Sequence, residues 1–108
     1  MPPRNRRPST PGEILKNLYL EPNGVSVARF ARAVGVSRKH MSNVIHGRAR
    51  VEPKLAIRIG TVLDTSPDLW LNIQRGVDVY DARRDLRGWK PAERLPLDGP
   101  EEIAAATS

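Results

Sequence analysis

Residues 38 to 46 carry polar side chains at a spacing that would place them on one side of a helix. A helix turns by about 100° per residue, so these side chains share one arc, opposite Met41, Val44 and Ile45. In the DNA major groove arginine and lysine donate to guanine, and asparagine pairs with adenine. The predicted base-reading residues are Arg38, Lys39, Ser42 and Asn43. For each one alone, an ordinary exposed polar residue or a phosphate contact stays an open alternative.

A second group of residues has the side-chain types that hold phosphate. Helix N-termini bind phosphate through free N–H groups, and Ser26 and Ser37 each stand where a helix should begin. Basic side chains follow nearby and can reach an anion. The predicted contacts to the DNA backbone are Ser26, Arg29, Ser37, His46, Arg48 and Arg50. Arg32 is expected to face solvent instead.

The charge distribution favours an anionic partner. The chain has 18 lysines and arginines against 12 acidic residues, a formal net charge of +6. No acidic residue lies between Glu21 and Glu52. A solvated surface is the usual explanation of a basic run, but an acid-free stretch of this length within the most helix-like part of the chain favours nucleic acid.

The spacing around one glycine is that of a helix-turn-helix over residues 27 to 46. When Val27 is the first of twenty positions, the fifth, ninth, fifteenth and eighteenth are Ala31, Gly35, Met41 and Val44. A small residue lets two helices cross closely, glycine permits the positive φ of a tight turn, and the apolar pair anchors the second helix. Two packed helices of any all-α domain would satisfy the same positions. The polar face of the second helix is what favours a DNA-binding motif over an ordinary helix pair.

Apolar residues at helical spacing predict five helices and no strand, which is an all-α fold. The predicted helices begin at or beside Pro11, Ser26, Ser37, Pro53 and Ser66. The first three are predicted to end at Pro22, Gly35 and Gly47. The fifth should extend through Trp70 and Ile73 to Val77 or Tyr80.

The chain is long enough for one domain with two tails. Residues 1–10 are predicted to be a flexible basic arm, residues 11–87 the helical domain, and residues 88–108 an irregular tail with at most a weak helix over 101–106. The arginines of the arm are Arg4, Arg6 and Arg7. A solubilising role is favoured for them over contact with the minor groove or the DNA backbone.

Several function classes find no support in the sequence. There is no cysteine, and His40 and His46 lie six residues apart, which would put them on diverging faces of a helix. No phosphate-binding glycine loop, nucleophile motif or paired-carboxylate cluster is present. We expect neither an enzyme nor a metal or cofactor. Without an apolar run of membrane-spanning length or a signal peptide, we expect a cytoplasmic protein that does not bind membranes.

Taken together, the motifs resemble the HigA/VapI-type antitoxins of the Cro/repressor (XRE) helix-turn-helix family. The resemblance runs from Pro11 to about Asp78. Its motifs are Pro11-Gly12-Glu13-Ile14-Leu15, Leu20-Glu21-Pro22, Gly24-Val25-Ser26, Ala31, Gly35-Val36-Ser37-Arg38, Gly47 and, most specific of all, Ser66-Pro67-Asp68-Leu69-Trp70-Leu71-Asn72-Ile73-Gln74. The chain departs from the family at Thr10, where histidine is frequent, and at Val77, where an aromatic residue is frequent.

The resemblance implies a five-helix, lambda-repressor-like domain, usually a homodimer. Such a protein represses its own operon by binding palindromic operator DNA, and neutralises a RelE-like ribonuclease toxin encoded beside it. Two alternatives stay open: a stand-alone repressor without a toxin, and a helical module whose basic face meets RNA or an acidic protein. The residues that could form either a dimer interface or core are Trp70, Ile73, Val77 and Tyr80; core is favoured for Trp70 and Ile73.

Overall fold

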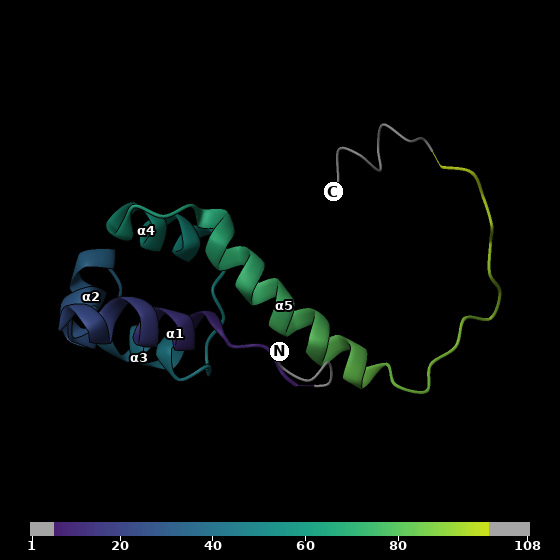
Figure 1. Cartoon of the computed structure of the whole chain (residues 1–108), viewed down its shortest axis with the longest axis horizontal. Helices are drawn as coiled ribbons and strands as arrows, with labels where there is room; N and C mark the ends of the chain where they lie inside the picture. Colours follow the sequence, from purple (N-terminus) through teal and green to yellow (C-terminus); the bar gives the residue numbers. More distant parts are fainter. Residues whose placement is uncertain (1–5, 100–108) are drawn as a thin grey trace.

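The computed structural model describes residues 6–99 of the chain, and all regular structure within that range is helical (Figure 1). The elements are α1 (Pro11–Ile14), a π-helical segment η1 (Leu15–Leu20), a 3₁₀ segment η2 (Glu21–Asn23), α2 (Val27–Val34), α3 (Arg38–Ile45), α4 (Pro53–Leu63) and α5 (Pro67–Asp85). Helices α1 to α4 gather at one end, and α5 runs diagonally away from them. The predicted five-helix, all-α fold is confirmed.

The first helical run begins with a reciprocal cap at Thr10. The Thr10 hydroxyl accepts from the Glu13 N–H at 3.1 Å, and the Glu13 carboxylate accepts from the Thr10 N–H. Pro11 then occupies the first turn, where its missing N–H costs nothing. Thr10 is only 8% exposed, so the folded domain includes this residue, which the sequence had assigned to the arm.

The same run changes helix type before it ends. α1 continues into η1, where the Glu21 N–H donates to the Lys16 carbonyl, five residues back. Pro22 has no N–H with which to extend that π-helical series, and the chain tightens into η2. The run ends with Gly24 at φ 65°, two residues beyond the predicted stop at Pro22.

Helices α2 and α3 form as their caps predict. The Ser26 hydroxyl accepts from the Arg29 N–H at 3.1 Å, and the Ser37 hydroxyl accepts from the His40 N–H at 3.0 Å. Gly35 ends α2 at φ 85°, a conformation in which other residues are strained. Only residues 35–37 therefore separate the two helices.

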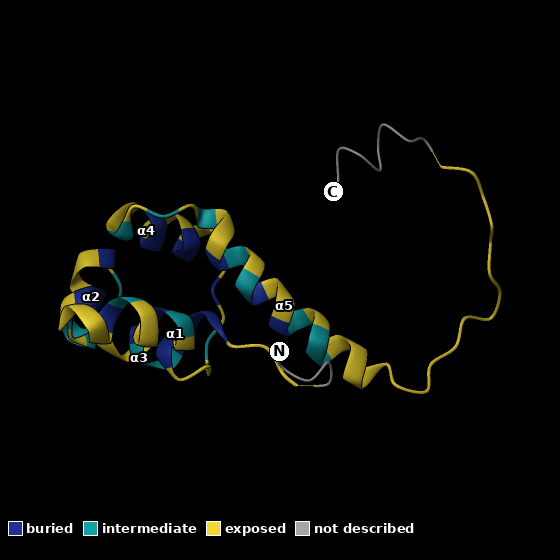
Figure 2. Cartoon of the chain, viewed as in Figure 1, coloured by how far each residue is buried: buried dark blue, intermediate teal, exposed yellow. Residues whose placement is uncertain are grey.

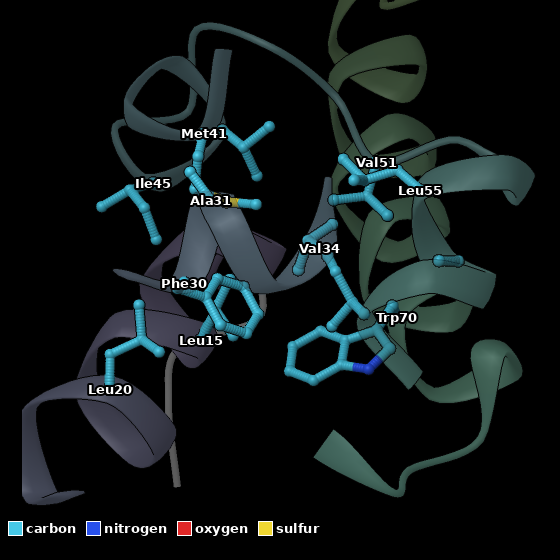
Figure 3. Close-up of a cluster of buried hydrophobic side chains, with 13 residues drawn as sticks. Leu15, Leu20, Phe30, Ala31, Val34, Met41, Ile45, Val51, Leu55 and Trp70 are labelled. Carbon is cyan, nitrogen blue, oxygen red and sulfur yellow. The ribbon is translucent and has the colours of Figure 1, made fainter. Parts of the chain in front are cut away.

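Every helix contributes one buried side to the core, as the dark blue stretches in Figure 2 show. The labelled side chains of Figure 3 converge from η1, α2, α3, α4 and α5, with Val51 contributed by the loop before α4. Trp70 is fully buried; its ring lies 5.3 Å from that of Tyr19, and its indole N–H donates to the Thr65 hydroxyl. Trp70 is therefore core, as predicted, and Ile73 packs partly buried against it.

A close approach between α1 and α3 depends on Gly12. A Cβ at this position would lie 2.0 Å from the Val44 carbonyl oxygen and 2.8 Å from the Ile45 Cα. Both atoms are backbone, so a side chain at Gly12 could be admitted only by moving a helix. Gly12 thus lets the first helix pack directly on the last turn of α3.

After α5 the chain is extended. Residues 89–99 form no helix or strand, and all of them are exposed. They include the apolar side chains Trp89, Leu95 and Leu97. The expected helix over 101–106, and the arm arginine Arg4, lie outside the described residues.

Candidate DNA-binding surface

Helix α3 separates an apolar side from a polar side as its sequence predicts. Met41, Val44 and Ile45 are buried against the rest of the domain. The predicted DNA-facing residues divide by exposure: Arg38, Lys39 and His46 are exposed, while Ser42 and Asn43 are half-buried. The structure therefore gathers the four predicted base readers on one helix that begins with the capped, solvent-exposed Ser37.

One end of this polar side is ordered by a contact between His46 and Ser42. The His46 Nδ1 lies 2.8 Å from the Ser42 carbonyl oxygen and 3.4 Å from its hydroxyl. Because a carbonyl can only accept, the short contact assigns the proton to Nδ1. The Nε2 of neutral His46 is then an acceptor, and a protonated ring would offer a second donor.

A second contact at the same C-terminal end of α3 joins Arg48 and Asn43. The Arg48 Nε donates to the Asn43 Oδ1 at 3.2 Å. The backbone N–H groups of Arg48 and Ala49 both donate to the Asn43 carbonyl, at 2.8 and 3.1 Å. The loop after α3 is thereby folded back onto Asn43.

Arg29, Arg32 and Arg48 are exposed on or beside the two helices. Ser26 and Ser37 lie at the N-termini of α2 and α3, and their hydroxyls accept from the backbone N–H groups of Arg29 and His40. Of these positions, the sequence assigns Ser26, Arg29, Ser37 and Arg48 to the DNA backbone and Arg32 to solvent.

Arg50, by contrast, is paired with acidic residues of the protein itself. Its guanidinium forms a two-pronged ion pair with Asp78 of α5, with the Nη1 to Oδ1 distance at 3.0 Å, and its Nε lies 3.4 Å from Glu52. The hydrogen bond from Arg50 holds the pKa of Asp78 below its usual value, and Asp78 raises that of Arg50. Asp78 and Glu52 together engage three of the five N–H groups of the guanidinium, whose side chain stays 54% exposed. The contact of Arg50 with the DNA backbone stays a prediction, and the surface described below is built from the other residues.

Gln74 extends the same network into the interior. Its Oε1 accepts from the buried Val51 N–H at 2.9 Å, and its Nε2 donates to Asp78 at 3.0 Å. The loop between α3 and α4 is thus tied to α5 through one buried amide and one ion pair. The sequence reading singled out neither Gln74 nor Asp78 for this role.

Arg7 is likewise held on α5. Its Nε and Nη2 each donate to Asp81 at 3.0 Å. The hydrogen bond from Arg7 lowers the pKa of Asp81. The described end of the arm therefore contacts the protein itself, which neither the solubilising role nor the DNA-contact role anticipated.

Arg58 of α4 is a further residue that sequence reasoning missed. Its Nη1 donates to the Gly35 carbonyl at 3.1 Å, in the turn between α2 and α3. Carbonyls at a helix C-terminus lack an intrahelical partner and attract cations, so an acceptor at Gly35 was foreseeable. Its donor was not, because it comes from another helix 23 residues further along the chain.

Within residues 6–99, no cluster of three or more histidine, aspartate or glutamate side chains is placed to hold a metal ion. No helix in the same range is long and apolar enough to cross a membrane.

Two short helices joined by a glycine turn, the second with a polar outer side, define a helix-turn-helix protein. The chain is 44% identical to the antitoxin HigA-1 of Vibrio cholerae over 78 residues, 72% of this chain and 73% of the relative. It is 33% identical over 82 residues to an uncharacterized HTH-type transcriptional regulator of Haemophilus influenzae, covering 76% of this chain and 77% of the relative. No protein-family model matches the chain.

Comparison with solved structures gives the same group of proteins. The Pseudomonas aeruginosa antitoxin HigA, solved with the higBA promoter, superposes with a TM-score of 0.76 at 32% identity over 85% of this chain and all of that one. The chain belongs to the HigA-type antitoxins and HTH-type regulators of the XRE helix-turn-helix family. The members with which it compares are regulators and antitoxins, which confirms the expectation of a non-enzymatic protein.

Proposed function

We propose that this protein binds operator DNA with α3 in the major groove and represses its own operon. Base edges are read by Arg38, Lys39, Ser42 and Asn43. The DNA backbone is held by Ser26, Arg29, Ser37, His46 and Arg48. The observation that carries the proposal is the division of α3 into a buried apolar side and an outward side made only of hydrogen-bonding groups.

The second part of the proposal is that the protein is an antitoxin that neutralises a RelE-like ribonuclease toxin. Its support is the 44% identity to a protein named antitoxin HigA-1. Further support comes from the structural likeness to an antitoxin solved with the promoter of a higBA operon.

The DNA-binding form is a homodimer. A single eight-residue helix in one groove buries little surface, whereas two copies related by two-fold symmetry would read two half-sites about one helical turn apart. A palindromic operator is the counterpart of this symmetry.

A stand-alone repressor without a toxin is the second candidate. The observation that favours it is the 33% identity to a relative named only as an HTH-type transcriptional regulator. Both candidates share the DNA-binding surface and differ in whether a protein partner exists.

The deciding experiment is a pull-down of the tagged full chain, expressed from its native operon together with the neighbouring genes. A stoichiometric, small, basic partner that stops growth when it is expressed alone supports the antitoxin. Recovery of the chain alone, together with a footprint on a palindrome upstream of its gene, supports the stand-alone repressor. A chain that footprints no DNA sequence overturns the shared part of the proposal.

For the DNA-binding surface itself, Arg38→Ala is compared with Arg83→Ala. Both substitutions remove one exposed arginine, but Arg83 lies in the last turn of α5, outside the proposed surface. Loss of operator binding in the first variant alone supports the surface. Equal loss of operator binding in both variants would mean that the effect comes from net charge alone.

A further inference from the structure

The loop after α3 brings Arg48 beside Asn43 by backbone geometry alone. Gly47, at φ 74°, reverses the chain, and its N–H donates to the Val44 carbonyl. The N–H groups of Arg48 and Ala49 then converge on the Asn43 carbonyl. These bonds do not involve the Arg48 side chain, so they persist when that side chain is shortened.

The side chain of Arg48 adds a bond that orients the Asn43 amide. Arginine has only donors, so the Asn43 atom 3.2 Å from the Arg48 Nε must be the oxygen Oδ1 and not the nitrogen. The amide is therefore held with Oδ1 toward the loop. Its Nδ2 group, with two hydrogens, is the part of the amide left to meet a ligand.

This orientation matters for which base Asn43 would read. Bidentate recognition of adenine requires the amide oxygen and the amide nitrogen to face the base edge together. A fixed Nδ2 group instead suits guanine, which presents two acceptors, N7 and O6, whereas adenine presents a donor beside its acceptor.

We propose that Arg48 is a positioning residue that makes Asn43 a donor and so selects guanine over adenine at the operator position read by Asn43. The proposal rests on the proposed DNA-binding function and deepens it. Arg48 would act on specificity through its Nε, while its outer nitrogens stay able to bind phosphate.

The test measures competition binding of the full-length protein to a set of operators that carry every single base-pair change. Asn43→Ala first identifies the position that depends on Asn43. Arg48→Ala is then measured there at the same salt concentration, with thermal melting to check folding. We expect the ratio of adenine to guanine affinity at that position to rise by at least about fivefold, the lower end of the range of one good bidentate pair, with other positions unchanged.

Arg29→Ala is the matched control for a purely electrostatic role, since Arg29 is an exposed arginine proposed to contact phosphate. A uniform loss across all operators in Arg48→Ala, as expected for Arg29→Ala, would overturn the proposal. No change at all in Arg48→Ala, or no base preference that depends on Asn43, would overturn it too. Failure of the wild-type protein to prefer any sequence is a different result, which removes the proposed function itself.

A measurement on the free wild-type protein tests the contact between Arg48 and Asn43 without DNA and without relying on the folding of an Arg48 variant. The Arg48 Nε–H should exchange with water more slowly than the Nε–H of exposed Arg83 in NMR spectra of the free protein. This protection should disappear in Asn43→Ala. Equal exchange at both arginines would show that Arg48 does not hold the amide in solution.

Discussion

The guanidinium of Arg58 in α4 donates a 3.1 Å hydrogen bond to the carbonyl of Gly35, the residue that ends α2. Gly35 lies in the left-handed conformation of a helix C-cap, and its carbonyl points away from the helix ladder. The bond therefore connects the turn of the helix-turn-helix to a helix that is not part of it.

Removal of this bond should loosen the turn. We expect Arg58→Met, which keeps most of the apolar stem, to lower the free energy of unfolding by about 1 kcal/mol, the usual net value of one hydrogen bond. Urea denaturation measures the change. Arg83→Met, on the exposed side of α5, is the control and should leave stability nearly unaltered. An unchanged urea midpoint in Arg58→Met would mean that water hydrogen-bonds to the Gly35 carbonyl as well as Arg58 does.

The two glycines Gly12 and Gly76 should respond to alanine in opposite directions. At Gly12 a Cβ would collide with the Val44 carbonyl, and the cost should reach about 3 kcal/mol or more because backbone must move. At Gly76, inside α5, a Cβ meets nothing within 4 Å, so alanine should stabilise by about 0.5 to 1 kcal/mol. Thermal unfolding of both variants checks this. Similar effects of the two substitutions would contradict the close approach of α1 and α3.

Gln74 should be more sensitive than its exposed neighbours on α5, because it is the acceptor for a buried N–H. Gln74→Met keeps the side-chain volume and leaves the Val51 N–H without its partner, at a cost of about 1 to 3 kcal/mol. Chemical denaturation measures the loss, with Arg75→Met as the exposed control. Hydrogen exchange at Val51 adds a local readout, since the protection of this one N–H should fall most.

The parts of this protein that could be predicted from its sequence are those fixed by near neighbours along the chain. The caps at Ser26 and Ser37, the turn at Gly35 and the two sides of α3 all depend on residues three or four positions apart. The contacts of Arg58 with Gly35, Arg50 with Asp78 and Gln74 with Val51 join residues 23 to 28 positions apart. Such pairs require the packing of α4 and α5 to be known first.

The same distinction applies only in part at the edges of the domain. The cap between Thr10 and Glu13 is local and could have been read from the sequence, whereas the burial of Thr10 depends on the packing around it. Arg50 looked unpaired because it lies within an acid-free stretch, whereas its partner Asp78 lies on α5. Charge counted along the chain does not show which cations are already paired.

The Arg50–Asp78 and Arg7–Asp81 pairs should make stability depend on pH at the acid end. Both aspartates have a pKa lowered below the ordinary 3.8, so each pair contributes fully at pH values above 3.8 and its contribution is lost as pH falls toward the folded-state pKa. We expect wild type to exceed Asp78→Asn in stability at pH 6, with the difference shrinking below pH about 3.8. Thermal melting across that range measures it. A difference that is constant with pH would indicate a packing effect of the substitution.

Salt dependence should separate phosphate contacts from base contacts on the proposed surface. Each phosphate neutralised releases counterions, so the slope of log affinity against log salt should become shallower by about 1 in Arg29→Ala. Arg38→Ala, if it removes a base contact, should instead cost about 1 to 3 kcal/mol on the specific operator and relax sequence preference. Binding titrations on operator and scrambled DNA at several salt concentrations distinguish the two. Equal losses on both DNAs in Arg38→Ala would move Arg38 from the base readers to the backbone contacts, because the loss of a base contact weakens binding to the specific operator more than to scrambled DNA.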